Sequence, residues 1–407
     1  MMTSIKQPLR PNEHISTQRA KDIFKAIRGT SEISKNDLWP KSDMTLSTLT
    51  RTLDELMTSE IIIESRLGLS TGGRRPILYQ VNHHYGCAIG LDISPHVSRL
   101  ALIDLAGNIY ASAQCLMTAE MCPDRLMDWV VNQAENWKQQ YADSFIHWIG
   151  MGIGTFGILD RSAGIIRQLE WYRAPGWKDV EIVRILEERL GMPVTLDNGA
   201  NSAITAAVWE IPSRQDYNWL YIHAASSIRS SMIYDGTLAH GINQFEGLLG
   251  QMIVQADGKS FWKHEGNKGC LDSYATVCAI QLEANYRIFM GEDSLIKQQL
   301  DYEEQEVQIT HIIEAAKLGD PTAIDLLTNA ATYLGIGLAN LLNVLHPDKV
   351  ILGGPLADID LYYHTAIESA MSRTYQHPHH QIDFILESHS EQALVIGSAL
   401  LILEQLA

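Results

Sequence analysis

The chain has 407 residues, of which 46% are apolar and 19% charged, a composition typical of a globular protein with two or three domains. Because no run of about 18 apolar residues occurs and the first residues lack the apolar core of a secretory signal, we expect a cytoplasmic protein with no membrane span. The net charge of −17 excludes a chain that coats nucleic acid along its whole length.

The charge is unevenly distributed along the chain. Residues 1–85 contain 12 Lys and Arg and 9 Asp and Glu, a net of +3, whereas the remainder contains 19 and 39, a net of −20. A mildly basic head on an acidic body indicates that one module contacts DNA while the rest stays away from it. Charge alone leaves chance variation open as the alternative.

Two helices are predicted at the start of the head. The first follows from four apolar residues at helical spacing, Ala20, Ile23, Phe24 and Ile27. Gly29 should end it. Ser34 lies three residues before Asp37, a capping pair for a short second helix. Pro40 falls within that second helix and should shorten or kink it, because proline lacks the backbone donor.

A third helix is predicted to begin near Thr45. Leucines at spacings of three, four and three predict one buried stripe, formed by Leu46, Leu49, Leu53 and Leu56. Short hydroxyl side chains and one arginine lie on the other side, namely Ser47, Thr48, Thr50 and Arg51. Such side chains suit a recognition helix that contacts base edges and phosphates in a major groove. A generic core helix is the alternative for this segment taken alone.

Two β-type runs follow, Ile61–Glu64 and Ile77–Val81, and we expect them to form a hairpin wing. Its tip carries two glycines, which allow close backbone approach, and two arginines: Gly72, Gly73, Arg74 and Arg75. A basic tip of this kind indicates contact with a minor groove, and a solvated loop is the alternative. The predicted DNA-binding residues are Thr45, Ser47, Thr48, Thr50, Arg51, Gly72, Gly73, Arg74 and Arg75.

This head resembles the winged helix-turn-helix of ROK-family regulators (repressors, open reading frames and kinases). The family pattern has a Leu-Ser start, a Thr-Val-Ser-Arg stretch, an apolar Leu and a Ser-x-Gly-Gly-Arg-Arg-Pro wing. The matching positions here are Met44-Thr45, Thr48–Arg51, Leu56 and Ser70–Pro76. Asp43 replaces the usual turn glycine, a change that Asp tolerates. The resemblance implies a DNA-binding domain over residues 1–82.

The body alternates strands and helices. Three successive strands, Cys87–Ile93, Val97–Asp104 and Ile109–Gln114, precede a helix at Asp124–Gln140, and a second set begins at Trp219–His223. Two such sets predict two α/β lobes with a cleft between them. We expect one lobe over about 83–210 together with a C-terminal helix at 390–407, and the other over 211–389.

The body also resembles the ROK family, whose fold is of the actin and sugar-kinase type. The resemblance is carried by motifs at Gly152-Ile-Gly154, Ala174–Trp177, Asn198 with Ala200-Asn201, Gly269–Leu271 and Gly353-Gly354. It implies an α/β fold for residues 83–407 and an ancestral sugar-kinase site.

The residues that a ROK kinase needs are replaced. Family kinases carry Asp-x-Gly-Gly-Thr-Lys, where this chain has Ser94 and Pro95 in place of the glycines. The second glycine-rich phosphate loop is here Ala225–Ser231, without a glycine. The catalytic Asp of Asn-Asp-Ala-Asn is Gly199, which cannot accept a proton. We therefore expect no enzyme activity, no catalytic residue and no cofactor.

The family's zinc site is also expected to be absent. The positions that match its His and Cys ligands are Gln251, Lys263, Glu265 and Cys270, which do not make a tetrahedral zinc site. The five cysteines show no Cys-x-x-Cys spacing, which predicts reduced thiols in place of a disulfide framework. They are Cys87, Cys115, Cys122, Cys270 and Cys278.

The resemblance also bears on whether the body binds a sugar-like ligand. Family positions that hold sugar hydroxyls carry over to Asn198, Gly199, Leu248, Gln251 and Asp272. Three of them keep a polar side chain, so the predicted ligand-binding residues are Asn198, Gln251 and Asp272. Their alternative interpretation is as structural remnants of a lost site.

The first functional hypothesis is a transcriptional regulator, a repressor of carbohydrate-related genes, that binds double-stranded DNA and responds to a sugar-like effector in the inter-lobe cleft. We expect a homodimer or homotetramer, because paired heads read paired half-sites. The second hypothesis keeps DNA binding but places control in a protein partner, with a non-functional cleft. The third, a sugar kinase, is disfavoured by the missing glycines and base.

Overall fold

The computed structural model describes residues 13–68, 75–169, 172–209, 211, 217–241, 247–260, 266–300, 306–375, 381–387 and 390–406. The chain forms two compact units. The first is Met1–Arg214 together with Gln392–Ala407, and the second is Gln215–Glu391. The predicted head therefore lies in the same compact unit as the first lobe.

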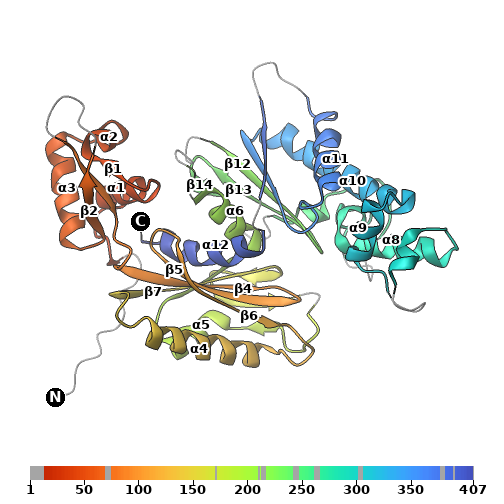
Figure 1. Ribbon diagram of the computed structural model, residues 1–407, viewed down its shortest axis with the longest axis horizontal. Coiled ribbons are helices and arrows are strands. Elements are labelled where there is room, and N and C mark those ends of the chain that lie inside the picture. The colour runs from red at the N-terminus through yellow and green to blue at the C-terminus, as the bar shows by residue number, and fades with distance from the viewer. Residues whose placement is uncertain are drawn as a thin grey trace. The chain divides into compact units, whose positions relative to one another are not determined.

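The head contains three helices and a small sheet (Figure 1). Helix α1 (Gln18–Arg28) is capped by Thr17, and strand β1 (Ile33–Ser34) leads into the four-residue helix α2 (Lys35–Leu38). The Ser34 side chain accepts a hydrogen bond from the Asp37 amide, which confirms the predicted cap. Pro40 lies in a 3₁₀ turn (Trp39–Lys41) that follows α2, so the expected shortening is confirmed.

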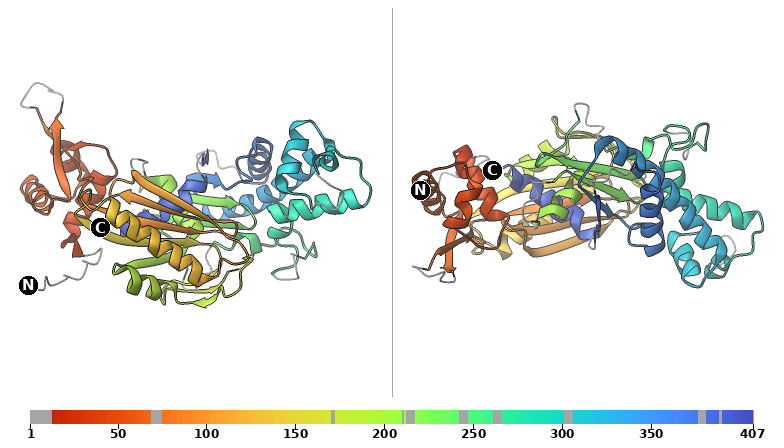
Figure 2. Two further views of the ribbon diagram at one scale, coloured as in Figure 1. Left: turned by 60° about the horizontal axis from the view of Figure 1, so that its bottom comes forward. Right: turned by 90° about the horizontal axis from the view of Figure 1, so that it is seen from above.

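Helix α3 (Leu46–Thr58) completes the helical part of the head, and the wing follows it. Strands β2 (Ile62–Leu67) and β3 (Ile77–Val81) pair antiparallel, and the sheet order is β1-β3-β2. Figure 2 shows this hairpin extending away from the helices of the head. The observed architecture is that of a winged helix.

The lobe of the first unit is built on a sheet of order β11-β7-β4-β5-β6. Strands β4 (Gly86–Ile93), β5 (Val97–Asp104) and β6 (Ile109–Leu116) are antiparallel neighbours. Strands β7 (His147–Thr155) and β11 (Val194–Asn198) run parallel to β4. Every residue of β4 is buried, as expected for a central strand that is covered on both faces.

The two faces of this sheet pack on different helices (Figure 1). One face, with Ile89 and Leu91, packs against α4 (Pro123–Gln140) and α5 (Ile182–Leu190). The other, with Ala88 and Ala101, packs against the C-terminal helix α12 (Ser390–Glu404). Helix α6 (Gly199–Trp209) follows β11 directly.

Helix α12 approaches the sheet so closely that two strand positions admit only glycine. A Cβ atom on Gly152 would lie 1.7 Å from the carbonyl oxygen of Ser398, and one on Gly90 would lie 1.9 Å from that of Val395. Both carbonyls belong to α12, so the helix backbone rests directly on strands β4 and β7. Close packing of the helix on the sheet therefore requires glycine at these two positions.

A small sheet of order β10-β9-β8 was not expected from the sequence. It contains β8 (Ile158–Asp160), β9 (Ile165–Gln168) and β10 (Lys178–Val180). Val180 ends strand β10, and helix α5 begins two residues later, at Ile182.

The second unit has its own sheet, of order β14-β13-β12-β15-β16. Its strands are β12 (Trp219–Ala224), β13 (Ile228–Tyr234), β14 (Thr237–Leu238), β15 (Lys349–Gly353) and β16 (Asp383–Leu386). Its helices are α7 (Asp272–Ala275), α8 (Val277–Phe289), α9 (Ile309–Lys317), α10 (Pro321–Leu345) and α11 (Asp360–Met371). Leu220 and Leu352 share one apolar core with α10 and α11. Both predicted strand sets are present, whereas α8 and α9 had no counterpart in the sequence analysis.

No helix among the described residues is long and apolar enough to cross a membrane. All five cysteines are free thiols.

Candidate functional site

The start of α3 presents a cluster of hydroxyl groups. The Thr45 side chain caps the helix by accepting from the Thr48 amide at 3.3 Å. Its Oγ1 also lies 3.0 Å from Ser47 Oγ and 2.8 Å from Thr48 Oγ1. The predicted hydroxyl residues are therefore held together at the N-terminal end of the helix, which is the end that a recognition helix presents to base edges.

The opposite face of α3 is apolar, with one correction. Leu49, Leu53 and Leu56 are buried as predicted. Leu46 is 43% exposed, so its place in the buried stripe was wrong. Leu46 is the first residue of α3, and the buried residues of the helix begin only at Leu49, so Leu46 belongs with the polar end of the helix.

Arg51 and Thr50 differ in solvent exposure and in their hydrogen bonds within the head. Arg51 is exposed one turn into α3. Thr50 is half-buried, its Oγ1 donates to the Leu46 carbonyl at 2.8 Å, and it lies 3.4 Å from Lys35 Nζ. We infer that Thr50 helps to place Lys35, a cation that the sequence analysis missed because it lies in another helix.

The wing is described only in part. Gly72, Gly73 and Arg74 lie outside the described residues, and Arg75 is exposed at the beginning of the returning segment. Strand β2 of the wing is held by an ion pair between Arg66 and Glu32, whose N–O distance is 2.7 Å. Hydrogen bonds from Arg66 and Ser65 lower the pKa of Glu32.

In the lobe, the position of the missing catalytic base is filled by an aromatic ring. A Cβ atom on Gly199 would lie 2.6 Å from a carbon of the Phe156 ring, closer than any packed side chain allows. Asp197 is already bound, because its Oδ1 accepts from Asn201 at 2.8 Å and from Arg161 at 3.1 Å. Asn198 Oδ1 accepts from the Ala200 amide at 2.8 Å and so caps α6.

The two segments that match the phosphate loops of the family kinases are ordinary connections between strands. In the first, Ser94 Oγ donates to the buried Asp92 carboxylate at 2.9 Å, and Pro95 offers no amide donor. In the second, residues 225–227 connect β12 to β13. Neither connection has the glycines that let backbone amides surround a phosphate.

In the second unit, the structure brings two of the three predicted ligand residues together. Gln251 Nε2 donates to Asp272 Oδ2 at 3.4 Å. Asp272 also accepts from the Ile228 amide at 2.8 Å, and Gln251 Oε1 accepts from the Asn267 amide at 2.9 Å. These bonds tie the pair to two further backbone segments, at Ile228 and at Asn267. Asn198 belongs to the first unit.

The residues that replace the zinc ligands are only partly described. Lys263 and Glu265 lie outside the described residues. Cys270 is buried, and its Sγ lies 3.4 Å from Ser273 Oγ. Within the described ranges, no three His, Cys, Asp or Glu side chains are grouped so that they could hold a metal ion.

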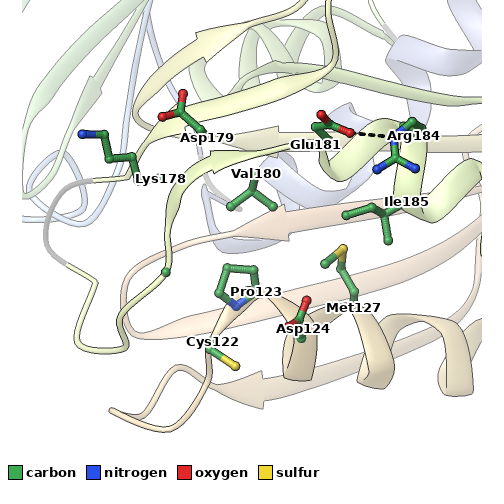
Figure 3. Close-up of a pocket in the computed structure, with 11 residues that line it drawn as sticks. Cys122, Pro123, Asp124, Met127, Lys178, Asp179, Val180, Glu181, Arg184 and Ile185 are labelled. Carbon is green, nitrogen blue, oxygen red and sulfur yellow. Dashed lines mark hydrogen bonds and ion pairs between the residues drawn. The ribbon is translucent and has the colours of Figure 1, made fainter.

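A surface pocket of about 450 Å³ lies elsewhere in the first unit (Figure 3). It is formed by the beginnings of α4 and α5 and by strand β10, and it carries charges of both signs. Two of the residues that line it, Glu181 and Arg184, form an ion pair in which Arg184 Nε lies 2.6 Å from Glu181 Oε2. The described residues that line it include none of the predicted site residues.

The chain is similar to known proteins over both the head and the body. The model of the ROK family matches residues 88–405. The xylose repressor of Bacillus subtilis is 26% identical over 384 residues, 94% of each chain. The DNA-binding transcriptional dual regulator NagC of Escherichia coli is 23% identical over 354 residues, 86% of this chain and 83% of NagC.

Solved structures give a parallel result. A ROK-family transcriptional regulator described as a homologue of E. coli Mlc has a TM-score of 0.80 at 23% identity, and the match covers 97% of both chains. A ROK hexokinase from Thermus thermophilus has a TM-score of 0.63 at 25% identity, covering 77% of this chain and 97% of the hexokinase. The regulator therefore matches nearly the full length of the chain, and the kinase matches about three quarters of it.

Proposed function

Because this chain belongs to the ROK family, we propose that it is a sequence-specific DNA-binding transcriptional regulator, a repressor of carbohydrate-related genes. The observation that carries the proposal is the polar start of α3, where capped hydroxyls and the exposed Arg51 stand opposite a buried leucine stripe. The similarity to the xylose repressor of B. subtilis and to the transcriptional regulator NagC of E. coli supports it.

In this proposal the residues divide by role. Arg51, Ser47 and Thr48 at the start of α3 contact base edges in the major groove. Arg75, with Gly72, Gly73 and Arg74 at the tip of the wing, contributes minor-groove and phosphate affinity. Lys35 adds a phosphate contact beside Thr50. We further propose a homodimer or homotetramer, since paired half-sites need paired heads.

We also propose that the body does not transfer phosphate. The Phe156 ring leaves no room for a carboxylate at position 199, and a base at that position would have to accept the proton of the sugar hydroxyl. A family member without the base and without the phosphate loops retains the fold and serves as a control module.

For the effector, we propose a sugar-type molecule, with the Gln251–Asp272 pair of the second unit as its candidate contacts. Asn198, in the first unit, stays a prediction from the sequence. Each of these side chains already makes hydrogen bonds within the protein, which fix its orientation toward a ligand. Control by a protein partner is the second candidate. A thermal-shift screen with xylose, glucose and N-acetylglucosamine separates the two, because a bound ligand raises the melting temperature.

The decisive experiment selects genomic DNA fragments with the purified full-length protein and then measures binding to the best fragment as a function of salt concentration. We expect a defined, roughly palindromic site. Arg51→Ala should weaken binding by about 5- to 150-fold, equivalent to about 1–3 kcal/mol for a lost base contact. Arg184→Ala, the same change at an exposed position on α5, is the matched control. Binding with no sequence preference, or none at low salt, contradicts the proposal.

A further inference from the structure

The head and the first lobe share one apolar core. Ile23, Phe24 and Ile27 of α1 belong to the same buried cluster as Leu400 and Leu403 of α12. The cluster also contains sheet residues of the lobe, such as Ala88 and Ile103. A DNA-binding head on a flexible tether would have a separate core, so this head is attached to a particular helix of the body.

One charged side chain lies inside this junction. Arg28, the last residue of α1, has only 3% of its side chain exposed. Its guanidinium donates to Glu404 Oε1 at 2.7 Å and to the Leu403 carbonyl at 3.3 Å. The same group lies 4.1 Å from the ring centre of Trp209, at the end of α6. Arg28 thus joins the head to the last turn of α12 and to α6.

These contacts are directional and costly to lose. A buried guanidinium needs its partners, since removing a partner leaves an uncompensated buried charge. The Leu403 carbonyl and Glu404 lie in the last turn of α12, where the helix dipole also favours a cation. Any displacement of that turn along its axis would separate the three groups. The position of α1 is therefore linked to the position of the end of α12.

A second contact fixes the segment that precedes α1. His14 Nδ1 lies 2.7 Å from the Tyr85 hydroxyl, and the rings of His14 and His147 have centres 5.1 Å apart. Tyr85 lies just before β4 and His147 begins β7. The head is therefore held at both ends of its first helix.

Helix α12 is also the segment by which the chain returns from the second unit to the first, since the second unit ends at Glu391 and α12 spans Ser390–Glu404. We propose that Arg28 is a positioning residue that locks the DNA-binding head to α12, so that movement of α12 changes the placement of the recognition helix. Base contacts are unaffected by this lock, whereas the spacing between paired heads depends on it. The inference rests on the proposed function, because it concerns binding to paired half-sites.

The first test uses the full-length protein without DNA. Hydrogen exchange should become more than about tenfold faster in peptides of α1 and of the end of α12 in Arg28→Met, which keeps the apolar stem and removes every donor. Glu404→Gln, made on the other helix, should have the same effect, and Arg28→Lys should restore part of the protection. Arg19→Met, an exposed arginine on α1, is the control. Unchanged exchange in both junction variants overturns the lock.

The second test compares DNA with one half-site and DNA with two. Arg28→Met should bind a single half-site as the wild type does, but lose about tenfold or more in affinity for the paired site, because only the paired site requires a fixed head placement. Equal loss on both DNAs, or no loss on either, overturns the positioning role. If the wild type binds neither DNA, the proposed function fails, and the DNA-free exchange experiment still decides the lock.

Discussion

Two buried titratable side chains in the second unit should make its stability respond to pH in opposite directions. His223 on β12 and Glu387 just after β16 are 6% and 8% exposed. Tyr221 lies between them, donating to Glu387 Oε2 at 2.7 Å and lying 3.3 Å from His223 Nδ1. Burial lowers the pKa of His223 to about 4, with the charge of Arg229 adding to the effect. Burial raises the pKa of Glu387 to about 7.

The direction in which stability changes with pH depends on whether the folded or the unfolded state binds the proton more tightly. Below about pH 6.5 the unfolded chain protonates its histidine while the folded His223 stays neutral, so this contribution to stability is lost as the pH falls from about 6.5 to 4. The folded Glu387 keeps its proton up to about pH 7, whereas the unfolded side chain releases it near 4.5. The contribution of Glu387 is therefore present at low pH and lost as the pH rises to about 7.

Each of the two pKa shifts corresponds to about 3 kcal/mol of unfolding free energy, because one pKa unit is worth about 1.4 kcal/mol. In the wild type the contributions of His223 and Glu387 to the unfolding free energy change in opposite directions between about pH 4.5 and 6.5. We therefore expect the stability of this unit to change by less than about 1 kcal/mol in that range. Glu387→Gln should expose the histidine slope, a rise of about 3 kcal/mol from pH 4 to 6.5. His223→Gln should expose the opposite slope.

Urea titrations at closely spaced pH values, followed by pulse hydrogen exchange in peptides of β12, report on this unit alone. A local readout is needed because a chain with two compact units need not unfold in one step. His240→Gln, a change at an exposed histidine of the same unit, is the matched control. Slopes of the same sign in Glu387→Gln and His223→Gln would refute the assignment of the two titrations.

Three further results are expected. Gly199→Asp should reduce the stability of the first unit and yield no ADP in a sugar-phosphorylation assay, whereas adding Phe156→Ala should restore the fold, still without turnover, because the phosphate loops are missing. Leu53→Ala should destabilise the head by about 2–5 kcal/mol, seen as faster exchange in α3 with β12 unchanged. Gly152→Ala should lower the melting temperature of the first unit, since the new Cβ meets the Ser398 carbonyl at 1.7 Å; an unchanged melting temperature would contradict the close approach of α12.

Much of the local structure was determined by the sequence itself. The strands Ile77–Val81 and Val97–Asp104 have the predicted bounds, and Ser34 caps α2 as its spacing to Asp37 indicated. The absence of glycines in both phosphate loops can also be seen in the sequence. These features depend on residues within one element, where spacing and residue type decide the outcome.

Contacts between distant elements were decided only by the tertiary structure. The sequence shows glycine at 199, but only the fold places the Phe156 ring where a side chain would be. It shows an arginine at the end of α1, but the partner of Arg28 lies 376 residues away, in α12. Leu46 fits the leucine spacing, yet 43% of it is exposed in the folded chain. Periodicity reports which face of an element is apolar, whereas the identity of the element that packs on that face depends on how the whole chain folds.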